Sequence, residues 1–258
     1  MALRQESHVL VVGGSDSSGG AGIARDIETL SAMGVRSCLA VTAVTVQTHD
    51  ILADILHLQP GLVADQMRAA LQANKLAAVK IGMLATAEIV AAVAAVLREN
   101  PGIPAVLDPV LASTSGRALL EASAIPIMKQ HLMPLCRIVT PNLMELALLA
   151  GSELAVDEVG ALQQGQQLLA TGVQALLIKG GHGSGPRSTD VLVRPNQEPV
   201  RLDTRRLART MRGTGCALAS AIAAYLAIGG SIEEAVRQAK LLVFEKIWKH
   251  PIGESGLR

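Results

Sequence analysis

Short apolar segments typical of β-strands alternate with longer segments of helical spacing along the chain, and this alternation constrains the fold more than any other feature. The pattern predicts strands over residues 8–12, 38–47, 77–81, 105–107, 137–139 and 175–178, a β-hairpin from 191–194 and 199–202, and helices over residues 23–33, 60–73, 87–99, 143–150, 156–170, 217–228 and 232–248. Such an order is typical of an α/β protein whose central, mostly parallel sheet carries helices on both faces. Since no linker, repeat or low-complexity segment interrupts it, we expect one domain over residues 1–258.

Composition excludes several classes of function. The chain has one Phe, one Tyr and one Trp and a formal charge of +1, so neither base stacking nor a cationic surface indicates nucleic-acid binding. Its three widely spaced cysteines suggest neither a disulfide framework nor a zinc site, and no signal region or membrane-length apolar run is present. We therefore expect a cytoplasmic protein without membrane partners, which binds a small molecule and forms a homodimer.

Polar side chains follow the ends of the predicted strands. Because the carboxyl ends of parallel strands meet at one edge of a sheet, these residues are expected to line one cleft. They are Gln47, Met83, Asp108, Asn142 and Lys179.

A glycine-rich turn, Gly213-Thr214-Gly215, precedes the apolar helix of residues 217–228. Backbone N–H groups at such a helix start, together with the helix dipole, form a site for an anion such as phosphate. Cys216 is expected on the first turn of this helix, where the pKa of a thiol is lowered. An ordinary loop that begins a buried helix, with Cys216 as a small core residue, explains the pentapeptide of residues 212–216 equally well.

The first loop, residues 13–22, is also rich in glycine but fits neither common phosphate-binding motif. Gly14 and Gly19 have P-loop spacing, yet Gly20 stands where the lysine is needed. Gly20 and Gly22 begin a dinucleotide fingerprint, but Arg25 occupies the third glycine position. We expect this loop to hold a substrate close to the backbone.

Asp108, Asn142 and Glu145 offer carboxylate and amide oxygens that suit Mg²⁺. Asn142 and Glu145 are also spaced as a helix capping box, and as an isolated pair they are better explained that way. Lys179 is a candidate ligand for a triphosphate, or alternatively a solvated strand end, and His182 is expected to be a structural loop residue. A lysine, an acidic cluster and an anion-binding helix start are together what phosphoryl transfer requires.

Five motifs resemble those of the hydroxymethylpyrimidine/phosphomethylpyrimidine kinases of thiamine biosynthesis, which belong to the ribokinase-like superfamily. They are Gly14-Ser15-Asp16-Ser17-Ser18-Gly19-Gly20-Ala21-Gly22-Ile23, Lys80-Ile81-Gly82-Met83, Thr140-Pro141-Asn142-Leu143 with Glu145, Lys179-Gly180-Gly181-His182 and Gly213-Thr214-Gly215-Cys216. They follow the family's order from the first predicted strand to the last helix.

The resemblance implies a ribokinase-like fold and transfer of phosphoryl from ATP·Mg²⁺ to 4-amino-5-hydroxymethyl-2-methylpyrimidine and then to its monophosphate. It further implies a pyrimidine site at Gly14, Ala21, Asp26, Gln47 and Met83. Asn142 and Glu145 would organise the metal and the phosphates, and Lys179 would contact the nucleotide. From the residues themselves we also expect Asp108 to join Glu145 as a metal ligand and Arg212 to contact the nucleotide at the anion site. Gly213, Thr214 and Gly215 would form the anion hole, Lys179 would neutralise the transferred group, and Cys216 would act on the substrate hydroxyl.

Two departures from the family pattern bear on these expectations. Arg212 stands where the family has histidine, and the tail of residues 250–258 differs from the family's Gly-His-Gly-rich segment. Arg212 either favours the phosphorylated substrate or faces solvent. The alternatives to a pyrimidine kinase are a pyridoxal/pyridoxine kinase of the same superfamily and a non-catalytic pyrimidine-binding homologue.

Overall fold

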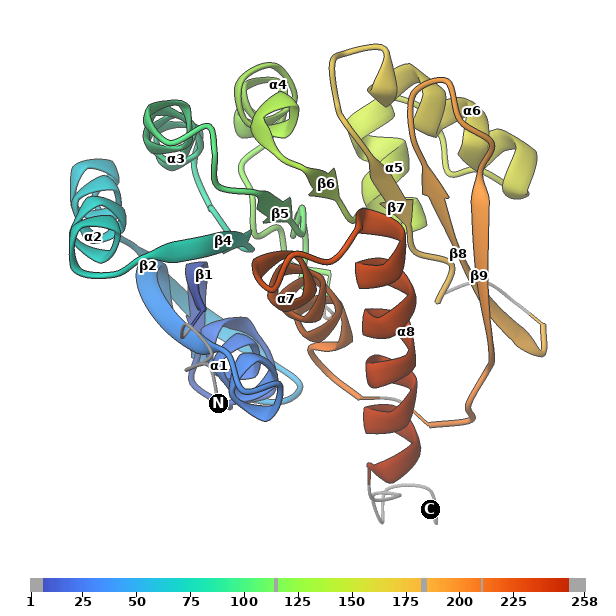
Figure 1. The fold of residues 1–258 in the computed structure, drawn as a ribbon, viewed down its shortest axis with the longest axis horizontal. Coiled ribbons are helices and arrows are strands. Elements are labelled where there is room, and N and C mark those ends of the chain that lie inside the picture. The colour runs from blue at the N-terminus through green and yellow to red at the C-terminus, as the bar shows by residue number, and fades with distance from the viewer. Residues whose placement is uncertain (1–6, 114–115, 182–184, 210, 251–258) are drawn as a thin grey trace.

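A single mixed sheet runs through the molecule (Figure 1). The structure, a computed structural model, describes residues 7–113, 116–181, 185–209 and 211–250. The strands follow the order β3-β2-β1-β4-β5-β6-β7-β8-β9. Their bounds are β1 His8–Asp16, β2 Arg36–Gln47, β3 Leu52–His57, β4 Leu76–Ile81, β5 Ala105–Leu107, β6 Ile138–Val139, β7 Leu176–Ile178, β8 Arg187–Val193 and β9 Val200–Arg205.

The six strands from β2 to β7 in this order pair in parallel, whereas β3 pairs antiparallel to β2, β8 to β7 and β9 to β8. The predicted mostly parallel α/β sheet is thus confirmed.

Helices cover both faces of the sheet. Their bounds are α1 Gly22–Ala32, α2 Pro60–Ala73, α3 Ala87–Glu99, α4 Ala124–Ile127, α5 Leu143–Ala150, α6 Glu158–Leu169, α7 Thr214–Ala227 and α8 Ile232–Lys249. One core lies under α2 to α6 and the other under α1, α7 and α8, and β1 supplies Leu10 and Val12 to the first and Val9 and Val11 to the second. Strands buried on both faces read as continuous apolar runs, which is why the sequence predicts them well.

Three features differ from the sequence predictions. Strand β1 continues through Gly13 to Asp16 after a shift in its register with β2, although this stretch was predicted as loop. Strand β3 and the short helix α4, with the π- and 3₁₀-helical turns that follow it, were not predicted.

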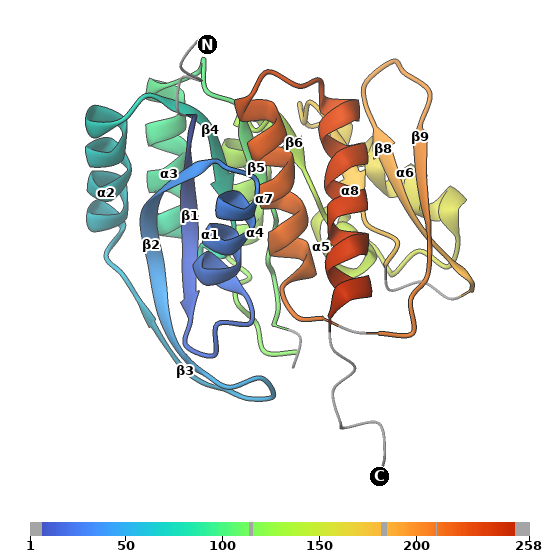
Figure 2. The same cartoon turned by 60° about the horizontal axis from the view of Figure 1, so that its bottom comes forward.

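The β2–β3 ribbon lies at the end of the molecule where α7 begins (Figure 2). None of the described helices has both the length and the apolar character needed to cross a membrane.

Candidate active site

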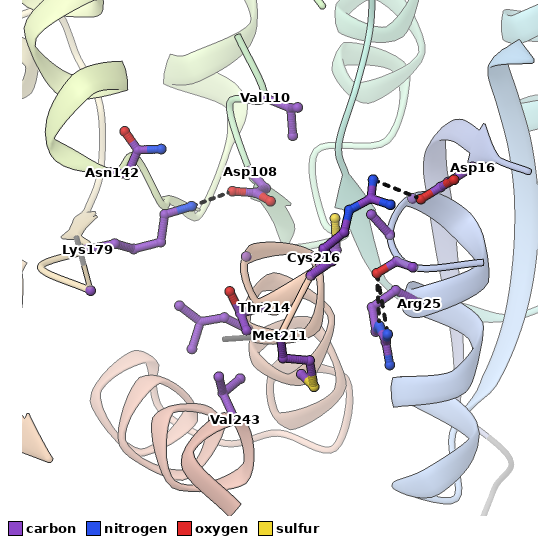
Figure 3. A pocket seen from close by; sticks show the side chains of 18 of the residues that line it. Asp16, Arg25, Asp108, Val110, Asn142, Lys179, Met211, Thr214, Cys216 and Val243 are labelled. Atoms are coloured by element: carbon purple, nitrogen blue, oxygen red, sulfur yellow. Dashed lines mark hydrogen bonds and ion pairs between the residues drawn. The ribbon is translucent and has the colours of Figure 1, made fainter. Parts of the chain in front are cut away.

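A cavity of about 1060 Å³ lies at the carboxyl ends of the parallel strands. Its lining includes all of the polar strand-end residues that the sequence predicted to converge, so that prediction is confirmed: Gln47, Met83, Asp108, Asn142 and Lys179. Lys179 and Asp108 point toward each other on one side of the cavity, Asp16 lies on the other, and Thr214 and Cys216 of α7 lie between them (Figure 3).

The glycine turn at the start of α7 is half-buried and faces this cavity. Gly213 caps the helix with a φ of 72°, in the left-handed region that glycine adopts at least cost. A Cβ atom on Gly213 would lie 2.5 Å from the carbonyl oxygen of Gly20, so the turn packs closely on the first loop. A Cβ on Gly215 would lie 3.3 Å from Asp108 Oδ2 and 3.4 Å from Lys179 Nζ. The helix start and the lysine are therefore parts of one site.

Lys179 is not a solvated strand end. Its Nζ lies 2.7 Å from Asp108 Oδ1 and 3.8 Å from Glu145 Oε2, and its side chain is 14 % exposed. Burial lowers the pKa of Lys179, but Asp108 and Glu145 outweigh this effect and hold the pKa above its ordinary value. Lys179 thus stays charged and lies between two carboxylates, Asp108 directly after β5 and Glu145 on helix α5.

Asn142 and Glu145 form the capping box that their spacing predicts. Asn142 Oδ1 accepts from the Glu145 N–H, and Glu145 Oε2 accepts from the Asn142 N–H, both at 2.8 Å. Glu145 Oε2 also lies 3.8 Å from Lys179 Nζ, so the capping box leaves Glu145 beside the cavity. Burial raises the pKa of Glu145 to about 7, although Lys179 opposes this.

Cys216 lies on the first turn of α7, as predicted, but the prediction of a lowered thiol pKa is wrong. Burial raises the pKa of Cys216 to about 11, and the nearby Lys80 only partly offsets this effect. The sequence places the thiol correctly at a helix start but does not show the protein atoms that remove water from it.

The five predicted pyrimidine-site residues, Gly14, Ala21, Asp26, Gln47 and Met83, all line the same cavity. A Cβ on Gly14 would lie 3.0 Å from the Met83 sulfur, so the backbone and the thioether form adjacent walls. The Asp26 carboxylate is already engaged, since Oδ2 accepts from Lys80 Nζ at 2.7 Å and Oδ1 from Ser220 Oγ at 2.8 Å.

Lys80 is a residue of the cavity for which the sequence analysis assigned no role. Its side chain is 1 % exposed and paired with Asp26. Burial lowers its pKa, but the Asp26 carboxylate outweighs this effect and keeps the pKa above its usual value. The available signal was a lysine inside the apolar strand of residues 77–81, since such a charge needs a buried partner.

Arg212 does not face solvent, so that alternative is wrong. Its Nη2 lies 3.4 Å from Asp16 Oδ2, and its Nη1 donates to Ser18 Oγ and to the Thr48 carbonyl, both at 3.1 Å. Its buried Nε has no hydrogen-bond partner within the described residues. Through these contacts Arg212 ties the glycine turn of residues 213–215, called the anion turn below, to the first loop. None of its contacts is with the predicted nucleotide residues Asn142, Glu145 and Lys179.

His182 and the tail beyond residue 250 lie outside the described residues. Within the described part of the chain, no three or more His, Cys, Asp or Glu side chains form a cluster that could hold a metal ion. The predicted metal ligands Asp108 and Glu145 are only two carboxylates, so a metal there needs further ligands from a substrate or water.

Comparisons with known proteins show the family of the chain. A family model described as phosphomethylpyrimidine kinase matches residues 16–255. A hydroxymethylpyrimidine/phosphomethylpyrimidine kinase of Rhizobium meliloti is 42% identical over 232 residues, which cover 90% of this chain and 86% of that protein. The crystal structure of a phosphomethylpyrimidine kinase from Clostridium difficile is similar with a TM-score of 0.80 and 34% identity, covering 93% of this chain and 99% of that one.

Pyridoxal kinases share the fold as well. The structure of the Staphylococcus aureus pyridoxal kinase in complex with pyridoxal matches with a TM-score of 0.86 and 30% identity, covering 94% of this chain and 88% of that one. The family model and the sequence relatives nevertheless point to the pyrimidine kinases. The chain is a ribokinase-like enzyme that belongs to the phosphomethylpyrimidine kinase family.

Proposed function

We propose that this enzyme transfers the γ-phosphoryl group of ATP to the hydroxymethyl group of 4-amino-5-hydroxymethyl-2-methylpyrimidine, and then to its monophosphate, in thiamine biosynthesis. One observation carries the proposal beyond family membership. The anion turn lies against Lys179 and Asp108 in the same cavity as Gly14, Gln47 and Met83. A phosphoryl donor and a small heterocycle can therefore meet in one cavity.

Phosphoryl transfer depends on positioning and on charge neutralisation, and different residues of the cavity supply each of these. Backbone N–H groups of Gly213, Thr214 and Gly215 bind the phosphate oxygens, and the start of the α7 dipole adds to the attraction. Lys179 neutralises charge on the transferring group. The hydroxyl oxygen forms a bond to the γ-phosphorus while the bond to the β–γ bridging oxygen breaks, and ADP leaves.

The acidic residues fit an Mg²⁺ ion that enters with the nucleotide. Asp108 Oδ2 and Glu145 Oε1 accept no hydrogen bond from the residues that the structure describes, so each carboxylate keeps one oxygen available. Carboxylate oxygens, water and substrate phosphates are the ligands that Mg²⁺ takes in kinases. When bound, the ion supplies positive charge to the polyphosphate. Asn142 fixes the orientation of Glu145 through the capping box.

Cys216 positions the substrate hydroxyl and accepts its proton late. Since the pKa of Cys216 is raised to about 11, only roughly one molecule in several thousand carries the thiolate at pH 7.5. The thiol is therefore the resting form and positions the hydroxyl. Only the small thiolate fraction can accept the hydroxyl proton, which becomes the S–H proton of Cys216 as the oxygen bonds to phosphorus and turns acidic. Cys216→Ser is expected to lose most turnover, and near-full turnover of that variant would exclude the base role.

In the pyrimidine site, Gln47 supplies directional hydrogen bonds and Met83 an apolar wall. Asp26 is held by Lys80 and Ser220, so its contribution to the ring is a second, shared hydrogen bond. The direct test measures ADP release with the pyrimidine alcohol, its monophosphate and pyridoxal. We expect turnover on both pyrimidines to exceed that on pyridoxal. Preferred turnover of pyridoxal would favour the pyridoxal kinase alternative, and binding without turnover would favour the non-catalytic one.

We also propose that the protein works in the cytoplasm as a single domain and pairs into a homodimer through the β2–β3 ribbon. Val44, Val46 and Leu56 are 45, 60 and 66% exposed, and Val44 pairs with Leu56 across the ribbon. An exposed apolar cluster of this kind is typical of an interaction site. Val46→Glu should shift the protein to the monomer in sedimentation velocity, whereas a monomeric unmodified protein would contradict the proposal.

A further inference from the structure

A buried ion pair in the wall of the cavity connects the last helix, α8, to strand β8. Lys240 on α8 lies 2.8 Å from Asp190 Oδ2 on β8, and both side chains are 8 % exposed. Both residues line the cavity, and α8 lies between α7 and the β8–β9 hairpin (Figure 2). Removing two charges from water costs as much free energy as their attraction returns, so stability alone does not explain such a pair.

The second oxygen of Asp190 has a specific partner next to Lys179. Asp190 Oδ1 accepts from the Gly180 N–H at 2.9 Å. Gly180 packs so closely on β8 that a Cβ would lie 1.9 Å from the Thr189 carbonyl oxygen. On the other side, the Lys179 N–H donates to the Pro141 carbonyl at 2.9 Å. The backbone that carries Lys179 is thus held between β8 and the segment that leads to Asn142.

The same helix also borders the cavity with apolar side chains. Val243, Phe244 and Ile247 line it and follow Lys240 at spacings of three, four and seven residues, which places all four on one face of α8. The position of this helix face is therefore coupled, through Lys240 and Asp190, to the turn that begins at Lys179.

We propose that Asp190 and Lys240 are positioning residues for phosphoryl transfer, which act by fixing the Lys179–Gly180 turn against the start of α7. The inference rests on the proposed function, because it takes Lys179 as the cation at the transferring phosphoryl group. Lys179 Nζ must reach both Asp108 and the donor, and a displacement of about 1 Å from productive geometry can cost about 100-fold in rate.

The test is a double-mutant cycle between Lys240→Met and Lys179→Ala, measured as kcat on the pyrimidine alcohol. Lys240→Met is expected to lower kcat tenfold or more, with ADP affinity changed less than threefold, because ADP has no γ-phosphate for Lys179 to contact. In the Lys179→Ala background the same substitution should lower kcat less than twofold. Lys240→Arg, which keeps the charge, should recover at least a third of wild-type kcat.

The matched control is Lys246→Met, which removes an ion pair between α8 and Glu28 of α1 at 3.2 Å without reaching the Lys179 turn. It should lower kcat less than twofold. The inference would be overturned if Lys240→Met lowered kcat by the same factor in the wild-type and Lys179→Ala backgrounds. It would also be overturned if Lys246→Met lowered kcat as much as Lys240→Met does. If Lys179→Ala alone keeps full kcat, the proposed role of Lys179 fails instead, and absence of turnover in the unmodified protein refutes the proposed function itself.

Discussion

Replacement of Gly213 by alanine tests the anion turn, because the structure separates two effects of the added methyl group. At a φ of 72° the Cβ costs roughly 1–2 kcal/mol in backbone strain. It would also lie 2.5 Å from the Gly20 carbonyl oxygen, whereas Cβ contacts under 3.0 Å essentially never occur. The two segments must therefore separate by at least 0.5 Å, the difference between these distances.

The separation moves the turn away from the first loop, where the pyrimidine is expected. Since a shift of about 1 Å can cost about 100-fold in rate, we expect Gly213→Ala to lower kcat/KM on the order of 10- to 100-fold. The strain lowers Tm by about 2–8 °C for a chain of this size. The assay is ADP release with the pyrimidine alcohol at varied ATP, alongside thermal unfolding of the same samples.

Gly34→Ala is the matched control. Gly34 has a φ of 71° after α1, and no atom lies within 4 Å of the Cβ position. It carries the same backbone strain and the same change in the unfolded chain, so its Tm should fall by the same strain-derived amount while kcat/KM stays at the wild-type level. If the two variants have kcat/KM values within threefold of each other, the close approach of Gly213 and Gly20 is not needed for catalysis and the reasoning fails.

Three further results are expected. Asp26→Ala leaves the buried Lys80 unpaired and should lower the free energy of unfolding in urea by about 3–5 kcal/mol. Glu99→Ala, which breaks the exposed pair with Arg68, should hardly move the urea midpoint, and equal effects of the two substitutions would contradict the burial argument. Alkylation of Cys216 by iodoacetamide, followed by mass spectrometry, should still accelerate between about pH 9 and 10.5, because its pKa is raised to about 11. A half-maximal rate near about pH 8.5, with a plateau above about pH 9.5, would show an ordinary thiol. Arg212→His removes a fixed guanidinium charge that lines the cavity and lies 3.4 Å from the Asp16 carboxylate, so turnover on the monophosphate relative to the alcohol should fall about tenfold. An unchanged ratio would reject a role of Arg212 in the second step.

Local patterns predict most of the elements, and the exceptions have physical reasons. Strand β3 is held by its pairing with β2 rather than by a buried face, and its Leu56 points outward, so the period-two signal of a half-buried strand is weak. Helix α4 and the turns after it contain Pro126 and Pro134, which the sequence rules treat as helix breakers. Long-range contacts decide both segments.

For the candidate site, the sequence predicts which residues lie together better than it predicts the contacts and the burial of each side chain. Strand ends meet in any parallel sheet, so the convergence of Gln47, Asp108 and Lys179 follows from topology. The partner of Lys80 and the direction of the Cys216 pKa shift do not, because both depend on which atoms from distant segments exclude water. Arg212 shows the same limit: its departure from the family pattern is visible in the sequence, but its contacts with the first loop are not.

The cavity draws its walls from both extremes of the described chain, with Gly14 near the beginning and Ile247 near the finish. No contiguous fragment therefore carries a complete binding surface, and recognition of either substrate must wait until the last helix has docked. Molecules that occupy the cavity hold early and late segments together, so they oppose global unfolding rather than a local opening. In the cell, such a kinase is expected to resist degradation best when its substrates are abundant.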